Sequence, residues 1–356
     1  LIGDGPWLPY SRPPLSKSFL KGDTQVEDLF LRPLAWFADN EVTLTLGQRA
    51  LAIDPARRVV HLAKDQIPYD TLVLATGTRP RTLADLPNST GNVVTLRGID
   101  DSRKVLDLLP SCQNVAVIGG GFIGLEFAAV MRAMGRNVTV IEAAPRLMGR
   151  AVSPALSDWF LALHKHHGVT LRLGAGARSW RNADRVSALV LPDDTVLPVD
   201  LVLVGVGVVP NDELARDAGL ACDNGIRVDD RLRSSDPAIF ALGDCCAFPL
   251  PDGRYVRLES VQNAVDQAKH LAKVLTGTDA PYAATPWFWS DQYDVKLQIA
   301  GLLPPGADAA SPDPGARGFS LDHAEGDALL CRESVNDPRA HLQARKTIQP
   351  SRQPTL

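Results

Sequence analysis

The sequence predicts an α/β protein with largely parallel sheets, and two observations support this. Residues 115–142 read as an apolar strand, a glycine turn, a helix of small residues and a second strand that ends on Glu142. Three further apolar segments, 69–78, 200–211 and 236–244, also lead into glycine or other small residues. Buried parallel strands are near-continuous apolar runs, and small residues at their carboxyl ends let a ligand approach.

Size and composition limit the functions open to the chain. Its 356 residues, 45% of them hydrophobic, can build two or three domains with cores of their own. The net charge of −4 suggests no basic surface for nucleic acid. No apolar run approaches the length of a membrane span. The five cysteines are scattered and form no Cys-x-x-Cys pair, which favours a reducing, cytoplasmic location.

No metal site is expected. His164, His166 and His167 have poor spacing for a metal ion, and the solvated end of a helix explains them better. Cys245 and Cys246 are adjacent, and we expect packed small residues there and no redox pair.

The glycine turn at 119–124 has the dinucleotide-binding spacing. Gly119 permits the tight turn from strand to helix, Gly121 lacks a Cβ and lets a pyrophosphate approach, and Gly124 lets the helix pack close to the strand. The free N–H groups at the helix start attract phosphate charge. Strand, turn, helix and second strand together predict a nicotinamide-dinucleotide site.

Glu142 sets the expected cofactor preference. It follows the last glycine by about 20 residues, where an acid accepts a hydrogen bond from a ribose 2′-OH. Its carboxylate would repel a 2′-phosphate, so NADH is expected to be preferred over NADPH. Arg146 and Arg150 follow closely and could soften that preference.

The chain begins as if in the middle of a motif. Residues 1–4 read as the end of a buried strand, without Met, so we expect a preceding strand, turn and helix of about 30 residues. A proline-rich loop at 7–17 follows, and its prolines hold Arg12 and Lys17 in place.

The remaining elements are expected in this order. Short strands lie within 37–62, and short antiparallel strands within 169–199. A helix covers 259–275, where small and apolar residues recur at helical spacing. A last module of short strands starts at Pro286 and ends in a helix over 339–348.

Six motifs in order resemble the FAD-dependent ferredoxin and rubredoxin reductases, the electron-entry components of bacterial aromatic-ring dioxygenase and haem-thiolate monooxygenase systems. The motifs are RPPLSK (12–17), ATG (75–77), GGGFIGLE (119–126), VGVGVVPN (204–211), ALGD (241–244) and PWFWSDQ (286–292). The resemblance covers essentially the whole chain and is nearest to the dioxygenase-type ferredoxin reductases.

The resemblance implies a fold like that of the pyridine nucleotide-disulfide oxidoreductases. It has two Rossmann-like three-layer (ββα) domains and a C-terminal α+β domain. FAD would be bound by 1–97 and 225–282, NAD by 98–224, and 283–356 would form the C-terminal domain. The family's first GxGxxG, which holds the FAD pyrophosphate, is absent from this sequence, so the FAD domain is N-terminally incomplete as written.

The resemblance also implies which residues touch each cofactor. Those assigned to FAD are Asp4, Arg12, Lys17, Ala50, Ala75, Thr76, Gly77, Arg97, Gly243, Asp244, Glu259, Val261 and Trp289. Those assigned to NAD are Gly119, Gly121, Phe122, Ile123, Gly124, Glu126, Glu142, Arg150 and Gly207.

The implied reaction passes electrons from NADH through flavin to a [2Fe–2S] ferredoxin or a rubredoxin, because flavin can take two electrons and release one at a time. Lys17, Glu126 and Trp289 are the catalytic candidates. By resemblance Lys17 and Glu126 pair beside flavin N5, although Glu126 could instead be an acid in the first turn of its helix. Trp289 would lie by the isoalloxazine near the ferredoxin, although Trp287 and Trp289 could equally be core residues.

An acidic ferredoxin requires a basic surface, for which the last module offers Arg332, Arg339, Arg345 and Lys346. The enzyme would be a monomer or a weak homodimer.

Three alternatives stay open. An NADH oxidase or peroxidase would need a redox cysteine in the 12–17 region, which contains none. The second is a protein like apoptosis-inducing factor, which acts through NADH-driven dimerisation or DNA binding. The net negative charge of the chain disfavours it. The third is a truncated remnant that holds no FAD.

Overall fold

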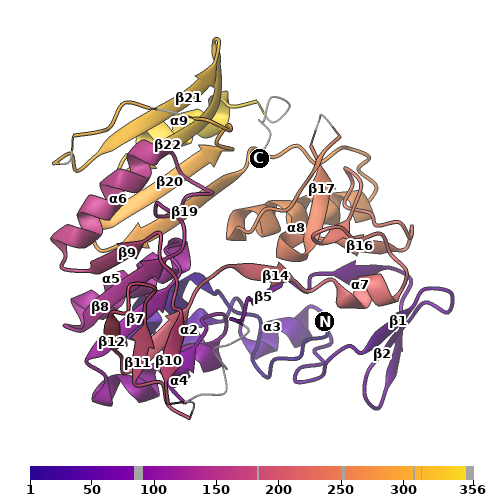
Figure 1. Cartoon of the computed structure of the whole chain (residues 1–356). Coiled ribbons are helices and arrows are strands. Elements are labelled where there is room, and N and C mark those ends of the chain that lie inside the picture. Colours follow the sequence, from indigo (N-terminus) through magenta and orange to yellow (C-terminus); the bar gives the residue numbers. More distant parts are fainter. Residues whose placement is uncertain (84–90, 183, 251–252, 308, 314, 350–356) are drawn as a thin grey trace. The chain divides into compact units, whose positions relative to one another are not determined.

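The computed structural model describes residues 1–83, 91–182, 184–250, 253–307, 309–313 and 315–349 (Figure 1). These divide into two compact units. The first unit comprises Leu1–Ser11, Glu27–Arg79 and Val209–Pro286, and the second comprises Arg12–Val26, Pro80–Val208 and Trp287–Leu356. Two of the places where the chain passes between the units lie within β5 (Thr78–Pro80) and β14 (Val208–Pro210).

The first unit is assembled from small sheets and helices. Its antiparallel sheet has the order β1 (Ala52–Asp54), β2 (Val59–His61), β3 (Gln66–Pro68). β4 (Leu72–Leu74) runs parallel to β16 (Ile239–Ala241). β15 (Ile226–Arg227) runs parallel to β17 (Cys246–Pro249), which pairs with β18 (Tyr255–Val256). The helices are α2 (Val26–Leu29), α3 (Leu34–Asp39), α7 (Glu213–Asp217), α8 (Val261–Leu275) and a 3₁₀ helix, Gly243–Cys245.

The second unit is built on a parallel sheet. Its strand order is β6 (Val93–Val94), β13 (Leu201–Val204), β7 (Asn114–Ile118), β8 (Asn137–Glu142), β9 (Thr170–Leu173). Its helices are α1 (Ser18–Lys21), α4 (Ile99–Leu108), α5 (Phe122–Ala133), α6 (Pro154–His166) and two 3₁₀ helices, Pro13–Ser16 and Leu109–Ser111.

Two antiparallel sheets complete the second unit. One has the order β10 (Ser179–Arg181), β11 (Ala188–Val190), β12 (Val196–Pro198). The other has the order β19 (Trp287–Gln292), β20 (Val295–Gly301), β22 (Ala328–Val335), β21 (Phe319–Glu325), and α9 (Pro338–Thr347) packs on β20 and β22.

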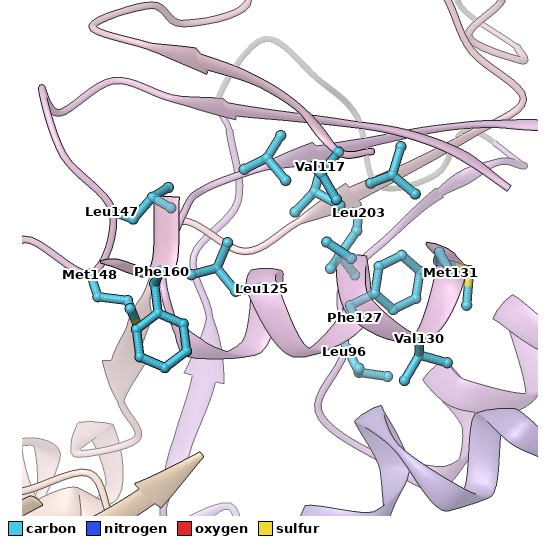
Figure 2. Packing of buried hydrophobic residues seen from close by; sticks show 14 of the residues in the cluster. Leu96, Val117, Leu125, Phe127, Val130, Met131, Leu147, Met148, Phe160 and Leu203 are labelled. Atoms are coloured by element: carbon cyan, nitrogen blue, oxygen red, sulfur yellow. The ribbon is translucent and has the colours of Figure 1, made fainter. Parts of the chain in front are cut away.

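The core of the second unit forms around α5. Leu125, Phe127 and Met131 on this helix are fully buried, with Val117 of β7 and Leu203 of β13 in the same cluster (Figure 2). The helix is buried on nearly all sides, which is why most of its residues are small or apolar, with Glu126 and Arg132 as its charged residues. This burial fixes the start of α5, and therefore the glycine turn, against the sheet.

The predicted strand, turn, helix and strand over 115–142 are confirmed, as are the helices predicted at 259–275 and 339–348. Two expectations are confirmed only in part. The short strands expected within 37–62 are present as β1 and β2, but Phe37 belongs to the helix α3, which begins after Pro33 and buries the Phe37 ring. The antiparallel strands expected within 169–199 are present as β10, β11 and β12, but β9 is a strand of the parallel sheet, because it pairs with β8. Its alternation reflects an edge position, which resembles an antiparallel strand in sequence.

The start of the chain also differs from expectation. Ile2 makes only an isolated parallel bridge to Thr45, and Leu1 is 60% exposed. A buried strand needs neighbours on both sides, and within the described residues Ile2 has this single partner.

The predicted domain boundaries do not coincide with the two units. Residues 12–26 and 80–97 lie in the second unit, and 209–224 lie in the first. The division into FAD, NAD and C-terminal domains therefore stays a prediction about function. None of the described helices combines the length and hydrophobicity that crossing a bilayer requires.

Candidate functional site

The glycine turn lies between β7 and α5 in the second unit. Gly119 has φ +111°, and a Cβ there would lie 2.3 Å from the Gly205 carbonyl oxygen. A Cβ on Gly124 would lie 2.2 Å from the Gly119 carbonyl oxygen. A Cβ on Gly121 would meet no described atom within 4 Å. Packing thus requires glycine at positions 119 and 124, whereas Gly121 leaves open space beside the start of α5.

That open space fits a pyrophosphate. Gly121 is the residue before α5 and has no side chain to bond the first N–H groups of the helix, which lack partners within any α-helix. A helix start with free N–H groups and room beside them is an anion-binding site. The residues present therefore fit the diphosphate of a nicotinamide dinucleotide.

Glu142 has a structural task that the sequence did not reveal. Its Oε2 accepts a 2.6 Å hydrogen bond from the Gly120 N–H, and its Oε1 accepts one of 2.7 Å from the Ala144 N–H. The carboxylate thereby ties the end of β8 to the glycine turn. Each oxygen keeps a second lone pair, so a ribose hydroxyl can still bind.

Other residues assigned to NAD gather near the turn or face solvent. Phe122 packs on Phe288 with ring centroids 4.4 Å apart, and Ile123 is 41% exposed. Gly207 has φ +99°, and an Arg150 guanidinium nitrogen would lie 3.5 Å from a Cβ built on it. Arg150 and Gly207 are therefore neighbours in the second unit, as their joint assignment requires.

Lys17 and Glu126 form an ion pair although 109 residues separate them. The Lys17 ammonium donates a 2.6 Å hydrogen bond to Glu126 Oε2, and their side chains are 20% and 7% exposed. Glu126 is the fifth residue of α5, so the alternative of an acid in the first helical turn is wrong. The expected pairing is present, and its place beside a flavin stays a prediction.

Two serines that the sequence reasoning missed also bind Glu126. The Ser16 hydroxyl donates to Oε2 at 2.8 Å, and the Ser290 hydroxyl donates to Oε1 at 2.8 Å. Ser16 lies in the RPPLSK motif and Ser290 in PWFWSDQ, so the motifs contained them. Nothing in either motif indicated that both serines bind the same carboxylate.

The two tryptophans of β19 are half-buried, so neither is a core residue. Trp289 and Trp287 lie with ring centroids 5.7 Å apart, and the Arg345 guanidinium lies 4.4 Å from the Trp287 ring. Of the four basic residues expected to attract a ferredoxin, Arg332 is bound to Asp322 at 2.6 Å. The Arg345 guanidinium lies over the Trp287 ring, whereas Arg339 and Lys346 are exposed.

Residues assigned to FAD are divided between the units. In the first unit β4 and β16 are parallel, so Ala75, Thr76 and Gly77 end at the same sheet edge as Gly243 and Asp244. The Thr78 hydroxyl donates to Asp244 Oδ2 at 3.4 Å. Small residues at the carboxyl ends of parallel strands let a ligand approach, so a bound ligand is expected at this edge.

Asn211 is a further residue at this edge that the site assignment omitted. Its side-chain amide donates to the Thr76 carbonyl at 2.9 Å, and its own carbonyl accepts from the Thr76 hydroxyl at 2.6 Å. These two bonds fix the ATG segment.

The other FAD candidates are more scattered. Val261 begins α8 and is 44% exposed, which suits an apolar contact with a flavin ring, and Glu259 is paired with Arg257 at 2.7 Å. Asp4 is exposed and Ala50 half-buried. In the second unit an Arg12 Nη1 donates to the Arg97 carbonyl at 3.4 Å. The place of these residues in an FAD site stays a prediction, and within the second unit the structure brings Arg12 and Arg97 together.

The solvated helix end expected at the histidine cluster is confirmed only in part, because His166 is exposed at the end of α6 whereas His164 is not. His164 is fully buried, with its Nε2 2.8 Å from Gln292 Oε1 and its Nδ1 3.1 Å from the Tyr293 hydroxyl. It lies on the face of α6 that packs inward, which the sequence spacing did not reveal. Within the described residues no group of His, Cys, Asp and Glu is arranged to hold a metal. Cys245 and Cys246 are buried and free, as expected of packed small residues.

Buried His164 should make stability depend on pH. Burial lowers its pKa to about 4, whereas an unfolded histidine has a pKa of about 6.5. Between these values the unfolded chain binds the extra proton, so stability falls as pH falls from 6.5 to 4, by about 3 kcal/mol. Urea unfolding from pH 4 to 7 would measure this. The variant His164→Gln should show a shallower slope, and an unchanged slope would contradict the assignment.

The chain is similar to known proteins over nearly its whole length. The family model described as pyridine nucleotide-disulphide oxidoreductase matches residues 1–268, and the one described as reductase C-terminal matches 287–356. Rhodocoxin reductase of Rhodococcus erythropolis is 47% identical, over 98% of this chain and 82% of the relative. The anthranilate 1,2-dioxygenase system ferredoxin–NAD(+) reductase component of Burkholderia cepacia is 41% identical, over 98% and 87%.

Among solved structures, the covalent putidaredoxin reductase–putidaredoxin complex contains a similar chain. It has a TM-score of 0.93 and 37% identity, and the match covers 98% of this chain and 86% of the other. These likenesses confirm the predicted fold class.

Proposed function

Because the chain belongs to the pyridine nucleotide-disulphide oxidoreductase family, and within it to the FAD-dependent ferredoxin reductases, we propose that it passes electrons from NADH through FAD to a [2Fe–2S] ferredoxin that feeds an oxygenase. The chain is thus an oxidoreductase that uses FAD and a nicotinamide cofactor, and its partner is a ferredoxin-type protein. Its NADH preference and the iron–sulfur type of its partner are part of the proposal.

One observation carries the proposal. The helix that starts at the glycine turn also holds Glu126, and this carboxylate binds Lys17 at 2.6 Å within a nearly buried pair. The dinucleotide turn and Glu126 belong to the same helix, and Lys17 from the 12–17 segment is bound to that carboxylate, so the pair would supply charge control close to a nicotinamide cofactor at the turn. Hydride transfer needs such positioning and charge control and needs no proton relay.

The chain's own residues have distinct tasks in this scheme. The glycine turn binds the nicotinamide dinucleotide, and Glu142 bonds its ribose and disfavours a 2′-phosphate. FAD, when bound, supplies the conversion between two-electron and one-electron transfer. Lys17 and Glu126 would set the charge beside it.

The remaining residues assigned to FAD would hold it in place. They are Asp4, Arg12, Ala50, Ala75, Thr76, Gly77, Arg97, Gly243, Asp244, Glu259 and Val261.

The docking surface is proposed around Trp289. The exposed basic residues Arg339 and Lys346 belong to the same module and would attract an acidic ferredoxin. A monomeric or weakly dimeric state and a cytoplasmic location remain predictions.

The test is a visible spectrum of the chain after incubation with FAD and desalting. Anaerobic NADH should bleach the flavin bands faster than NADPH, and added [2Fe–2S] ferredoxin should restore them. In a Lys17→Met variant the bands should be present, and bleaching should slow about tenfold or more because the charge opposite Glu126 is lost.

Other outcomes identify the alternatives. A colourless protein would indicate a remnant that binds no FAD. Bleaching that oxygen reverses and ferredoxin does not would indicate an NADH oxidase. Dimerisation on adding NADH, without electron transfer, would indicate a protein like apoptosis-inducing factor.

A further inference from the structure

An unbroken run of hydrogen bonds leads away from Glu126 through the second unit. The Ser290 hydroxyl lies 2.8 Å from Glu126 Oε1, and Gln292 Nε2 lies 3.2 Å from the Ser290 oxygen. Gln292 Oε1 lies 2.8 Å from His164 Nε2, and His164 Nδ1 lies 3.1 Å from the Tyr293 hydroxyl. The run joins α5, β19, α6 and the turn after β19.

The three middle members of the run are isolated from solvent. Ser290, Gln292 and His164 are each 0% exposed, and Glu126 is 6% exposed. Buried polar side chains are costly unless every one is satisfied. Apolar residues would fill these positions at less cost if only packing mattered, so the polar run has another task.

The chemistry of the members fixes the direction of every bond. Glu126 binds the Lys17 ammonium and is therefore an acceptor, so the single proton of Ser290 is donated to it. The Ser290 oxygen must then accept from the Gln292 amide nitrogen. That orientation leaves the Gln292 oxygen facing His164.

The direction of the two remaining bonds, those of His164 to Gln292 and to Tyr293, follows from the same donor and acceptor rules. Because the Gln292 oxygen accepts, His164 carries its proton on Nε2. Burial lowers the pKa of His164 to about 4, so the ring is neutral at pH 7 and Nδ1 is an acceptor. The Tyr293 hydroxyl must donate to it. All four donors thus point toward the Glu126 carboxylate.

The backbone of Tyr293 is a second, independent observation on this arrangement. Tyr293 is the first loop residue between β19 and β20 and has φ +58°. Glycine or asparagine is preferred at such positions, and a bulky side chain there is strained. The tyrosine is held by its bond to His164 and by its stacking on His167, with ring centroids 3.7 Å apart and planes at 10°.

We propose that Ser290, Gln292, His164 and Tyr293 are positioning residues that hold the Glu126 carboxylate in the orientation in which it binds Lys17. This inference rests on the proposed function. The two carboxylate oxygens have separate tasks: Oε2 binds Lys17 and Ser16, and Oε1 is held by the polar run. Without the run, Oε1 would lose its donor and the carboxylate could rotate away from Lys17.

The tautomer of His164 is the first test, and it requires no NADH. In protein with ¹⁵N-labelled histidine, His164 should be the Nε2–H tautomer at pH 7. Ser290→Ala removes the group that orients the Gln292 amide, so a second set of ring signals from the Nδ1–H tautomer should appear. A wild-type His164 in the Nδ1–H form would reverse the deduced direction and overturn the inference.

The rate of flavin reduction by NADH is the second test. Ser290→Ala should slow it about tenfold, as expected for losing one hydrogen bond to a charged group, with the Kd for NADH unchanged. Tyr293→Phe keeps the ring on His167 and removes the outermost donor, so it should slow reduction about twofold.

Ser157→Ala is the matched control. Ser157 is also buried and lies on α6 with His164, but it donates to the Leu147 carbonyl at 2.7 Å, outside the run. It should leave the rate and the tautomer unchanged. If Ser290→Ala behaves like Ser157→Ala while the wild type is reduced normally, only this inference fails. If NADH does not reduce wild-type flavin, the proposed function fails and the positioning role falls with it.

Discussion

Replacing Gly124 by alanine should destabilise the second unit by roughly 4 kcal/mol or more and remove NADH binding. The added Cβ would lie 2.2 Å from the Gly119 carbonyl oxygen and 3.1 Å from Val117 Cγ1. The oxygen belongs to the main chain of a tight turn in which Gly119 has φ +111°, so it cannot move aside cheaply. The helix would have to shift away from the sheet and carry the turn with it.

Gly121→Ala should instead leave stability nearly unchanged while it weakens NADH binding. Its Cβ would meet no described atom within 4 Å, and its φ of −82° suits any residue. Stability should therefore change by less than about 0.5 kcal/mol. NADH binding should still weaken at least about tenfold, because the methyl group occupies the space proposed for the pyrophosphate.

The two variants separate packing from binding in one experiment. Urea unfolding followed by tryptophan fluorescence measures stability, and titration with NADH measures binding. Gly176→Ala, another position where a Cβ meets no described atom within 4 Å, is the control that should alter neither. Normal stability of Gly124→Ala would contradict the packing argument, and normal NADH affinity of Gly121→Ala would contradict the proposed position of the pyrophosphate.

The features predicted correctly from the sequence are those that depend on residues close together along the chain. The turn at Gly119, Gly121 and Gly124 follows from residues within a few positions of one another, and its strand and helix were assigned correctly. Glu142 was placed on the correct strand end, but its bond to the Gly120 N–H depends on the return of the chain after a helix and was not foreseen. Propensity also failed at Phe37, whose burial in a short helix is decided by tertiary packing.

The candidate site depended more on contacts between distant segments. The Lys17–Glu126 pair spans 109 residues and was expected only through the family resemblance. The Ser290–Glu126 bond spans 164 residues, and the His164–Gln292 bond spans 128. Serine, glutamine and histidine have no periodicity that marks them as buried partners, so their roles required the structure.

Glu333→Ala should cost about 3 kcal/mol or more of stability, because it removes a buried carboxylate on which several hydrogen-bond donors converge. Glu333 is 0% exposed, and its Oε1 accepts from the Ser153 N–H at 2.7 Å. Its Oε2 accepts from the Ser153 hydroxyl at 2.5 Å and lies 2.9 Å from His323 Nε2. Ser153 caps the start of α6, so the carboxylate links β22 to the helix that carries His164.

Alanine would leave the Ser153 N–H and the His323 ring buried without that partner. Glu333→Gln should cost less than Glu333→Ala, because its amide oxygen can still accept from one of these donors. The control is Glu325→Ala, an exposed glutamate at the end of β21, which should change stability by less than about 0.5 kcal/mol. Urea midpoints compare the three variants. If Glu333→Ala were as stable as Glu325→Ala, the buried carboxylate would not hold β22 to α6, and the position of α6 would depend on its other contacts.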